Sequence, residues 1–583
     1  MKNIYRRLRN LTLRGKIEVN KAIASFSKKE WRVFLVLLGV LIITTVLILE
    51  NINKSFMVKV PIRGGSVSEG IVGTPRFINP VLAFSDVDRD LITLVYSGLM
   101  RKSEDGTLIP DLAESYEASE DGLVYTFIIK EDAYFHDETK VTAEDVVFTI
   151  SSIKDPLITS PRKSNWDGVT VEAVDERTVR FNLKQPYTSF LESTTLGILP
   201  KALWSNSPIE LNNANTAPVG SGPFKIEVAS KQSSGIIDHF KLAAFEDFAL
   251  GKPYLKTFDL YFYANENDLI DALKSGKISQ ISSITPSNAQ ALKSSNFRIE
   301  SSVLPRVFGL FFNQSQNQLF TNKAVVKAID QIIDKDRIVR EVLGGYGVVI
   351  DDPIPPNMTA YQKFSIENKA PREKALEEAT ALLAKDGWVK NTEGFLEKTT
   401  TQNKKKTTIP LEFSISTVNA PELAKSATLI AEDLAQFGIK VDVKTFELGN
   451  LNQSVIRPRK YDALLFGQII NNESDLFAFW HSSQRKDPGL NIALYTNAKV
   501  DKILEDAFIT LDEKVRIEKY GQFENEIKKD MPAIFLYSPN FIYVVSDSLQ
   551  GLDMEHLATP QDRFLNSYLW YTKTDNVWKI FSK

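Results

Sequence analysis

The residues that most often carry out catalysis are present in this chain, but no familiar catalytic spacing joins them. The four histidines are scattered, and none lies in an H-E-x-x-H zinc pattern (His136, His239, His481 and His556). There is no G-x-S-x-G nucleophile elbow, no G-x-x-x-x-G-K-[ST] phosphate loop, and no G-x-G-x-x-G after a strand. The chain has no cysteine, which excludes disulfides, thiolate metal ligands and cysteine nucleophiles. We therefore predict a protein that is not an enzyme and that holds no metal and no cofactor.

A dense group of carboxylates occurs in the stretch PDLAESYEASEDGLVYTF, residues 110–127 (Asp111, Glu114, Glu117, Glu120 and Asp121). Their spacing is too irregular for a calcium loop, which needs alternating oxygen ligands and a glycine at its sixth position. Glu120-Asp121-Gly122 is instead a turn pattern, followed by a run of β-formers over residues 123–129. The carboxylates are thus expected on the solvated face and in the turn of a β-hairpin.

Other local patterns alternate irregularly between strand and helix. Residues 169–183 predict a second hairpin with its turn at Asp175-Glu176-Arg177. Thr142-Ala-Glu-Asp145 is a capping box that begins a helix. Pro421 and Gly438 frame another helix, because proline favours a first turn and glycine a helix end. Without repeats or strict strand-helix alternation, these patterns indicate α/β lobes with interrupted connectivity.

Length and composition set the scale of the fold and narrow the range of partners. A chain of 583 residues, 43% of them apolar and 25% charged, is an ordinary folded protein too long for one core. Two or more lobes are therefore expected. The net charge is −3 for the whole chain and about −11 without residues 1–32, so nucleic acid is not an expected partner.

The N-terminal region has the pattern of a membrane anchor. Residues 33–49 (VFLVLLGVLIITTVLIL) are uncharged and would span about 25 Å as a helix. Residues 1–32 carry ten Lys/Arg against two Glu, which keeps this end cytoplasmic by the positive-inside rule and exports the rest. The alternative is a cleaved signal peptide, but the apolar run is long and no small-x-small site follows it. We predict a basic cytoplasmic segment (1–32), a transmembrane anchor (33–49) and a linker (50–65).

A series of short motifs, in this order along the chain, resembles the family 5 extracellular solute-binding proteins of bacterial ABC importers, the group that binds oligopeptides, dipeptides and nickel. The motifs lie at residues 95–100 (VYSGLM), 110–127, 133–148, 218–224 (PVGSGPF), 251–255 (GKPYL), 311–313, 328–330 and 438–441. Each motif is weak alone, but their collinear order is specific. The resemblance spans roughly residues 66–545.

The resemblance implies a two-lobed periplasmic-binding-protein-like fold of type II with an extra subdomain. It places lobe I at about residues 66–100, 217–308 and 530–583, the extra subdomain at about 101–216, and lobe II at about 309–529. Gly220 and Gly222 in the segment Pro218–Pro223 would permit backbone angles closed to other residues, in a crossover between lobes. Glu138 departs from the glycine usual in the family at this turn.

The function implied is binding, without catalysis. A member of this family captures a peptide or similar small polar solute outside the cytoplasmic membrane, as a monomer, and delivers it to the permease of an ABC transporter. Closure of the lobes around the solute would present a surface to the permease. The alternative is a ligand sensor or adhesin that uses the same fold without transport.

The resemblance also implies the position of the ligand's amine anchor. Peptide-binding members hold the free α-amine with an aspartate of lobe II, in a segment that corresponds here to residues 461–475. The anchor position falls on Asn471, which is neutral, although Glu473 and Asp475 are near. A buried ammonium without a counter-charge costs several kcal/mol. Either the ligand lacks an α-amine, or another carboxylate replaces the aspartate.

Five further residues are predicted to meet the ligand by the same resemblance. The segment after Asn79-Pro80 of lobe I touches the ligand backbone in the family, and Gln468 and Ile469 border the anchor position. The corresponding residues of lobe I are Phe84, Ser85 and Asp86. For each of these residues, the alternative is that it only packs in the wall of the cleft.

Overall fold

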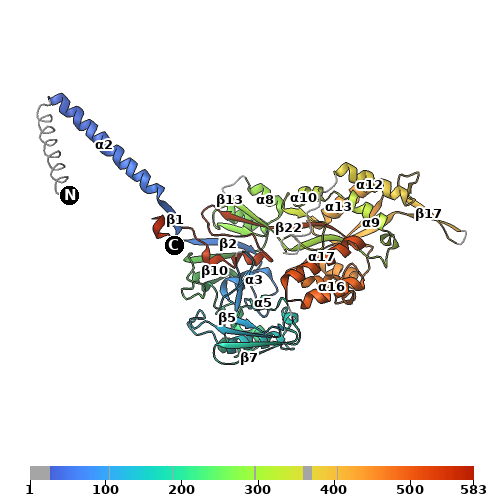
Figure 1. The fold of residues 1–583 in the computed structure, drawn as a ribbon, viewed down its shortest axis with the longest axis horizontal. Coiled ribbons are helices and arrows are strands. Elements are labelled where there is room, and N and C mark those ends of the chain that lie inside the picture. The colour runs from blue at the N-terminus through green and yellow to red at the C-terminus, as the bar shows by residue number, and fades with distance from the viewer. Residues whose placement is uncertain are drawn as a thin grey trace, which may run out of the picture. The chain divides into compact units, whose positions relative to one another are not determined.

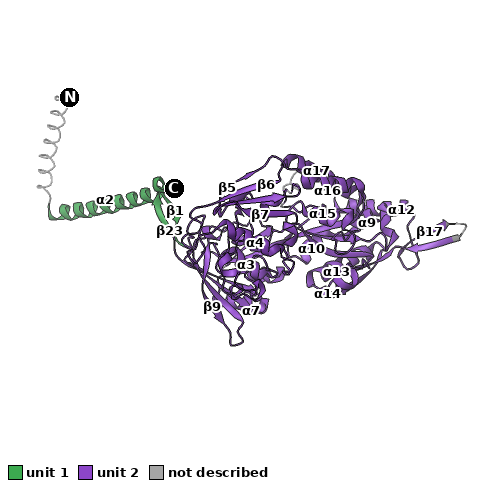
Figure 2. Ribbon diagram, turned by 90° about the horizontal axis from the view of Figure 1, so that it is seen from below, with its two compact units in different colours: residues 1–62, 573–583 green, residues 63–572 purple. Residues whose placement is uncertain are grey.

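The structure is a computed structural model that describes residues 27–103, 105–186, 188–293, 297–356, 358, 371–402 and 405–582. The chain forms two compact units, residues 1–62 with 573–583 and residues 63–572 (Figure 2). The predicted basic segment, up to residue 26, lies outside the described residues.

The first unit is built on one long helix. Helix α2 (Lys28–Ser55) begins with a capping box, in which the Ser27 amide donates to Glu30 Oε2 at 2.7 Å. The helix is long and apolar enough to cross a membrane. Residues 50–65 were predicted to be a linker, but the helix continues to Ser55 and strand β1 (Met57–Pro61) follows, paired antiparallel with β23 (Thr574–Trp578). The pairing partner is over 500 residues away in sequence, so local patterns could not reveal it.

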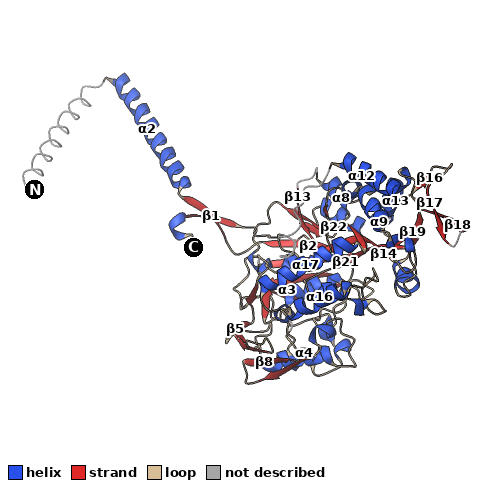
Figure 3. Ribbon diagram, turned by 45° about the vertical axis from the view of Figure 1, so that its right-hand side comes forward, coloured by secondary structure: helices blue, strands red, loops and turns tan. Residues whose placement is uncertain are grey.

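A large mixed sheet organises the second unit (Figure 3). Its strands follow the order β20-β19-β21-β14-β22-β12-β2-β11-β10-β9, and β13 and β15 also pair with β22. The bounds are β2 (Ser66–Val72), β9 (Phe224–Lys231), β10 (Ile237–Ala244), β11 (Thr257–Tyr263), β12 (Gln280–Ser282), β13 (Phe297–Val303), β14 (Arg306–Phe312), β15 (Gly347–Val349), β19 (Glu412–Val418), β20 (Lys440–Phe446), β21 (Ala463–Ile469) and β22 (Ala533–Ser546).

Strand β22 joins two lobes. Its residues 533–539 pair with β14 and β15, and its residues 540–546 pair with β12 and β13. We call the part with β2 and β9–β13 lobe I, and the part with β14, β15 and β19–β21 lobe II. The chain crosses between them at β22 and again between β13 and β14, at Leu304-Pro305.

Helices cover both lobes (Figure 1). Each lobe has its own apolar cores, because its helices bury apolar faces against the sheet or against neighbouring helices. The helices of lobe I are α3 (Asp86–Val95), α7 (Glu266–Lys274) and α8 (Pro286–Leu292). Those of lobe II are α9 (Lys323–Ile332), α10 (Lys335–Glu341), α12 (Arg372–Lys385), α13 (Pro421–Gln436), α14 (Leu448–Leu451), α15 (Asp475–Trp480), α16 (Ala498–Ile509) and α17 (Glu513–Asp530). A three-stranded sheet extends from lobe II: β16 (Val389–Lys390), β17 (Leu396–Gln402) and β18 (Lys405–Pro410).

A separate four-stranded antiparallel sheet, with strand order β5-β6-β8-β7, lies between β3 and β9 in sequence. Both predicted hairpins belong to it and are confirmed, β5 (Ala113–Ala118) with β6 (Val124–Ile129), and β7 (Val169–Ala173) with β8 (Thr178–Leu183). Helix α4 (Ala143–Lys154) begins at the predicted capping box, where the Thr142 amide donates to Asp145 at 2.8 Å. Short helices α5 (Phe190–Ser193) and α6 (Lys201–Trp204) and the pair β3 (Met100–Lys102) and β4 (Leu108–Pro110) complete this region, which we call the small-sheet region.

One member of the acidic group differs from its prediction. Asp111 is fully buried and accepts from Arg101 Nε at 2.8 Å, whereas Glu114 stays exposed and pairs with Arg177. A buried carboxylate requires such a partner, and Arg101 is supplied by the neighbouring strand β3. The prediction of a solvated face is therefore wrong for Asp111.

Gly220 and Gly222 are needed for a reason other than the one predicted. Neither has a positive φ, but a Cβ at Gly220 would lie 2.0 Å from the Val95 carbonyl oxygen, and one at Gly222 would lie 2.6 Å from the Val95 carbonyl carbon. The segment leads into β9 against the end of α3, so close backbone approach selects glycine here. Glu138 occupies the left-handed region, at φ 69°, a conformation that glycine adopts without strain.

His136 has a structural environment. Its amide donates to the Gly220 carbonyl at 2.7 Å, and its Nε2 lies 3.0 Å from the Gly222 carbonyl oxygen. Burial lowers the pKa of His136 to about 4. The histidine is therefore neutral at physiological pH and ties its turn to the glycine segment.

Candidate functional site

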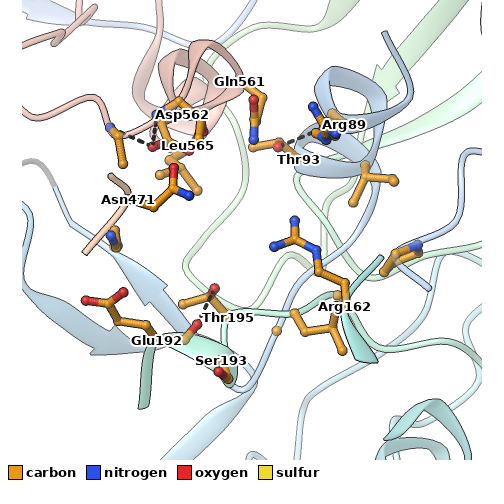
Figure 4. A pocket seen from close by; sticks show the side chains of 18 of the residues that line it. Arg89, Thr93, Arg162, Glu192, Ser193, Thr195, Asn471, Gln561, Asp562 and Leu565 are labelled. Atoms are coloured by element: carbon orange, nitrogen blue, oxygen red, sulfur yellow. Dashed lines mark hydrogen bonds between the residues drawn. The ribbon is translucent and has the colours of Figure 1, made fainter. Parts of the chain in front are cut away.

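A cavity of about 700 Å³ opens between the two lobes and the small-sheet region (Figure 4). Its wall draws on both lobes and on the small-sheet region. Lobe I contributes the first turns of α3 and the short helix η7 (Pro560–Phe564), and the small-sheet region contributes residues around Arg162 and Glu192. Arg306 stands where the chain enters lobe II, and the segment after β21 completes the wall. A solute in this space would contact both lobes at once.

The segment after β21 presents polar groups to the cavity. Ile469, Asn471, Asn472 and Asp475 line it. The Oδ2 of Asp475 accepts from the Asn471 amide at 2.8 Å and from the Asn472 amide at 3.4 Å, which fixes the turn before α15. Burial nevertheless raises the pKa of Asp475, and the charge of Glu473 adds to this rise. A cation in the cavity would stabilise its ionised form.

Glu192 adds a second carboxylate to the same end of the cavity. Burial raises the pKa of Glu192, the neighbouring Lys102 opposes the rise, and the charges of Glu473 and Asp475 increase it. A hydrogen bond from Asn472 reaches its carboxylate. Glu192 and Asp475 thus form an acidic end of the cavity, with Lys102 as the nearby cation and Glu473 as a further negative charge close to them. Such a group of desolvated carboxylates attracts an ammonium.

Three arginines form a basic end. Arg89 is bonded within lobe I, donating to Asp86 Oδ1 at 2.7 Å and to the Phe84 carbonyl at 2.8 Å. For the guanidinium groups of Arg162 and Arg306, no hydrogen bond or ion pair occurs within the described ranges. Desolvation by the surrounding protein lowers the pKa of both Arg162 and Arg306. Arginine remains charged despite such shifts, so these donors are available to an anion.

The two ends lie on opposite sides of the cavity. In Figure 4, Glu192 and Asn471 are on one side, and Arg89 and Arg162 extend from the other. Contacts between the small-sheet region and lobe II close the acidic side: the hydroxyls of Ser189 and Ser474 are 3.1 Å apart, and Asn472 meets Glu192. The cavity therefore suits a solute with a cationic and an anionic group at its two ends.

Of the six residues predicted to contact ligand, three line the cavity and three do not. Asp86, Ile469 and Asn471 line the cavity together. Phe84 is 57% exposed and outside the cavity wall, and Ser85 caps α3, its Oγ accepting from the Asp88 amide at 3.1 Å. Gln468 is buried in β21, opposite Val307 of β14.

The charged residues that distinguish this cavity were not predicted. Arg162, Glu192 and Arg306 come from three distant parts of the chain, and none belongs to a motif of the sequence. Arg306 could have been noticed as a charge between two apolar runs, LPRVFGLFF, at the start of a strand. For Arg162 and Glu192 no sequence pattern indicates the role. No group of three or more metal-ligating side chains occurs in the described part of the chain.

Comparison with known proteins places this architecture in a family. Residues 107–488 match the family model described as "Bacterial extracellular solute-binding proteins, family 5 Middle". The oligopeptide-binding protein AppA of Bacillus subtilis is 31% identical over 504 residues, which cover 84% of this chain and 89% of AppA. Protein XP55 of Streptomyces lividans is 26% identical, covering 84% of this chain and 86% of XP55.

Solved structures agree. The structure of AppA from Bacillus subtilis in complex with a nonapeptide superposes with a TM-score of 0.66 at 30% identity, covering 88% of this chain and 100% of AppA. The structure of NikZ from Campylobacter jejuni in complex with Ni(L-His) gives 0.66 at 28% identity, covering 87% and 99%. The predicted two-lobed α/β fold is confirmed, as is the prediction of a binding protein in place of an enzyme. This chain belongs to the bacterial extracellular solute-binding proteins of family 5.

Proposed function

We propose that this protein is held in the cytoplasmic membrane by α2, captures peptides with free termini in its interlobe cavity, and delivers them to the permease of an ABC transporter. The observation that carries the proposal is the separation of charge in the cavity, with Glu192 and Asp475 at one end and, at the other, Arg162 and Arg306, which have no ion pair among the described residues. A peptide is a zwitterion, with an ammonium at one terminus and a carboxylate at the other. Relatives named for peptide binding support this solute class.

The neutral Asn471 at the expected anchor position need not exclude an amine. Glu192 and Asp475 lie beside it and are desolvated, so their ionised forms gain from an adjacent ammonium. At the other end, Arg162 and Arg306 offer several N–H donors each to a carboxylate, in the planar arrangement that favours paired hydrogen bonds. We therefore assign amine binding to the carboxylate pair Glu192 and Asp475, with Asn471 as a neutral neighbour.

The proposed anchoring follows from the continuity of the first unit. Helix α2 runs past the apolar residues 33–49 to Ser55, and β1 begins two residues later. A signal peptide would end at a cleavage site before the folded chain, whereas here the helix leads into a paired strand. The basic residues before the apolar run orient the helix with its first residues in the cytoplasm, so that the solute-binding unit is extracytoplasmic. We expect a monomer, with its two lobes joined at Leu304-Pro305 and in the middle of β22.

Calorimetry on the full chain in lipid nanodiscs tests this function. A peptide found by thermal-shift screening of a peptide pool is compared with its N-acetylated and C-amidated forms, which each lack one terminal charge. Because each charge meets a desolvated counter-charge, we expect each modification to weaken binding by about tenfold or more. Equal affinity of all three forms would contradict the proposed roles of both ends. No binding by any peptide would contradict the solute class.

A further inference from the structure

A segment from the far end of the sequence is fixed to the end of the membrane helix in the first unit. Strands β1 and β23 pair with Met57 opposite Trp578 and Pro61 opposite Thr574. The amide of Lys579 then donates to the carbonyl of Phe56, the residue that ends α2, at 2.9 Å. We call β1, β23 and the short helix η9 (Lys579–Phe581) the collar. The green unit of Figure 2 shows β1 and β23 directly after α2.

A side-chain hydrogen bond sets the level of the collar along α2. The indole N–H of Trp578 donates to Asn53 Oδ1 at 2.8 Å. Asn53 is four residues beyond Leu49, the last of the apolar run, and therefore about 6 Å farther along the helix. Where α2 crosses a membrane, this is the depth of the lipid headgroups, since the hydrocarbon core ends with the apolar run.

The collar exposes large apolar side chains at that depth. Phe56 is 62% exposed, Trp578 is 49% exposed, and Ile580 and Phe581 are each 75% exposed. Tryptophan is enriched at membrane interfaces because its ring is apolar and its N–H polar. Trp31 lies about 33 Å before Asn53 along the helix, so an aromatic residue stands near each boundary of a hydrocarbon core roughly 30 Å thick.

We propose that Trp578, Ile580 and Phe581 of the collar insert into the interface between headgroups and acyl chains of the same membrane that α2 crosses. The protein then meets the lipid at two places, the helix and a segment that the sequence places more than 500 residues later. Lys579, between Trp578 and Ile580, suits anionic headgroups, whereas Lys54 on α2 is paired with Glu50 at 2.6 Å. This inference rests on the proposed anchoring by α2.

Site-specific fluorescence tests the inference. Since the chain has no cysteine, one cysteine at a time can be introduced and labelled with an environment-sensitive dye, in the full chain reconstituted in liposomes. The variants are Phe581→Cys in the collar, Leu41→Cys in the apolar run, and Asp575→Cys on the same strand about 10 Å from Trp578. Quenching by lipids labelled at a headgroup-level position or deep in the chain reports depth.

We expect the dye at position 581 to be blue-shifted and quenched most by the headgroup-level lipid, and the dye at position 41 by the deep lipid. The dye at 575 should be quenched less than that at 581. If labelled lipid quenches the dye at position 41 but not the dye at position 581, the insertion of the collar is overturned and the anchor by α2 stands. The same conclusion applies if the dye at 581 is blue-shifted without being quenched, because protein then shields it from water. Failure of quenching at both 41 and 581 overturns the anchor as well.

Discussion

Two arginine sites within the second unit differ in whether the fold itself supplies hydrogen-bonded partners for a desolvated guanidinium. Arg563 is 1% exposed and donates to both oxygens of Asp90, at 2.8 and 2.7 Å, and to Glu69 Oε1 at 2.7 Å. Its guanidinium also lies 3.9 Å from the centre of the Phe564 ring, and the Tyr543 hydroxyl completes the network by donating to Glu69 at 2.6 Å. This cluster ties η7 to β2, α3 and β22.

Arg162 and Arg306 have no comparable partners among the described residues, although the surrounding protein lowers the pKa of each. Removing a charge from water costs several kcal/mol unless a counter-charge replaces the water. At Arg563 the counter-charges are built into the fold, so the arginine stabilises the native state. At the cavity, Asp562 and Asp86 attract Arg162 and Arg306 only through space, without a hydrogen bond among the described residues, so a ligand carboxylate would recover part of the cost as binding energy.

Replacing Arg563 should have the largest effect on stability. The variant Arg563→Met leaves Glu69 and Asp90 buried without a cation, and we expect a loss of about 3–5 kcal/mol in the free energy of unfolding. Denaturant unfolding followed by circular dichroism measures it. The matched control Arg162→Met should change stability by less than about 1 kcal/mol, because no internal ion pair is broken. Equal losses in the two variants would show that the two sites do not differ.

For ligand affinity we expect the reverse of the order for stability, with the larger effect at the arginines of the cavity. In Arg162→Met and Arg306→Met, each loss of charge-assisted hydrogen bonds to a peptide carboxylate should weaken binding by about 10- to 100-fold. Calorimetry with a free peptide and with its C-amidated form measures the effect. For the amidated form the variants should bind about as well as the unmodified protein. If both forms lose affinity equally, the arginines do not recognise the carboxylate.

The two arginine sites also show which features of the fold and of the cavity can be predicted from the sequence. Turn and cap patterns are read over a few neighbouring residues, so both hairpins and the capping box at Thr142 were predictable. Ile469 and Asn471, which were named from the family resemblance, line the cavity. In the sequence, Arg162 and Arg563 each lie among ordinary polar residues. Arg563 differs from Arg162 because the fold brings Glu69 and Asp90, hundreds of residues away, into contact with its guanidinium. The pairing of β1 with β23 was hidden for the same reason.

The acidic end of the cavity should make binding depend on pH. Burial raises the pKa of Glu192 and of Asp475 from its ordinary value, while a bound ammonium requires their ionised forms. Affinity should therefore be full above these raised pKa values and fall as pH decreases through them, by at most about tenfold per pH unit for each group. Calorimetry from about pH 8 to pH 5 measures it. The variant Glu192→Gln should bind peptide more weakly, and its affinity should depend less on pH. An unchanged pH dependence would show that Glu192 does not bind the amine.

The contact between Ser189 and Ser474 should have the smallest effect, and it tests whether closure, as well as charge, contributes to binding. A neutral hydroxyl pair at 3.1 Å contributes about 0.5–1 kcal/mol, so Ser189→Ala should weaken peptide binding by roughly two- to fivefold without altering its pH profile. Ser474 also bonds to Asn472, so Ser474→Ala alone is ambiguous, and a double-mutant cycle isolates the pair. A coupling near zero would mean that the lobes are held around the ligand by its charged ends alone. Because the hydroxyls meet each other and leave the ligand's termini free, amidated and acetylated peptides should lose the same factor, unlike the selective losses expected at the arginines and at Glu192.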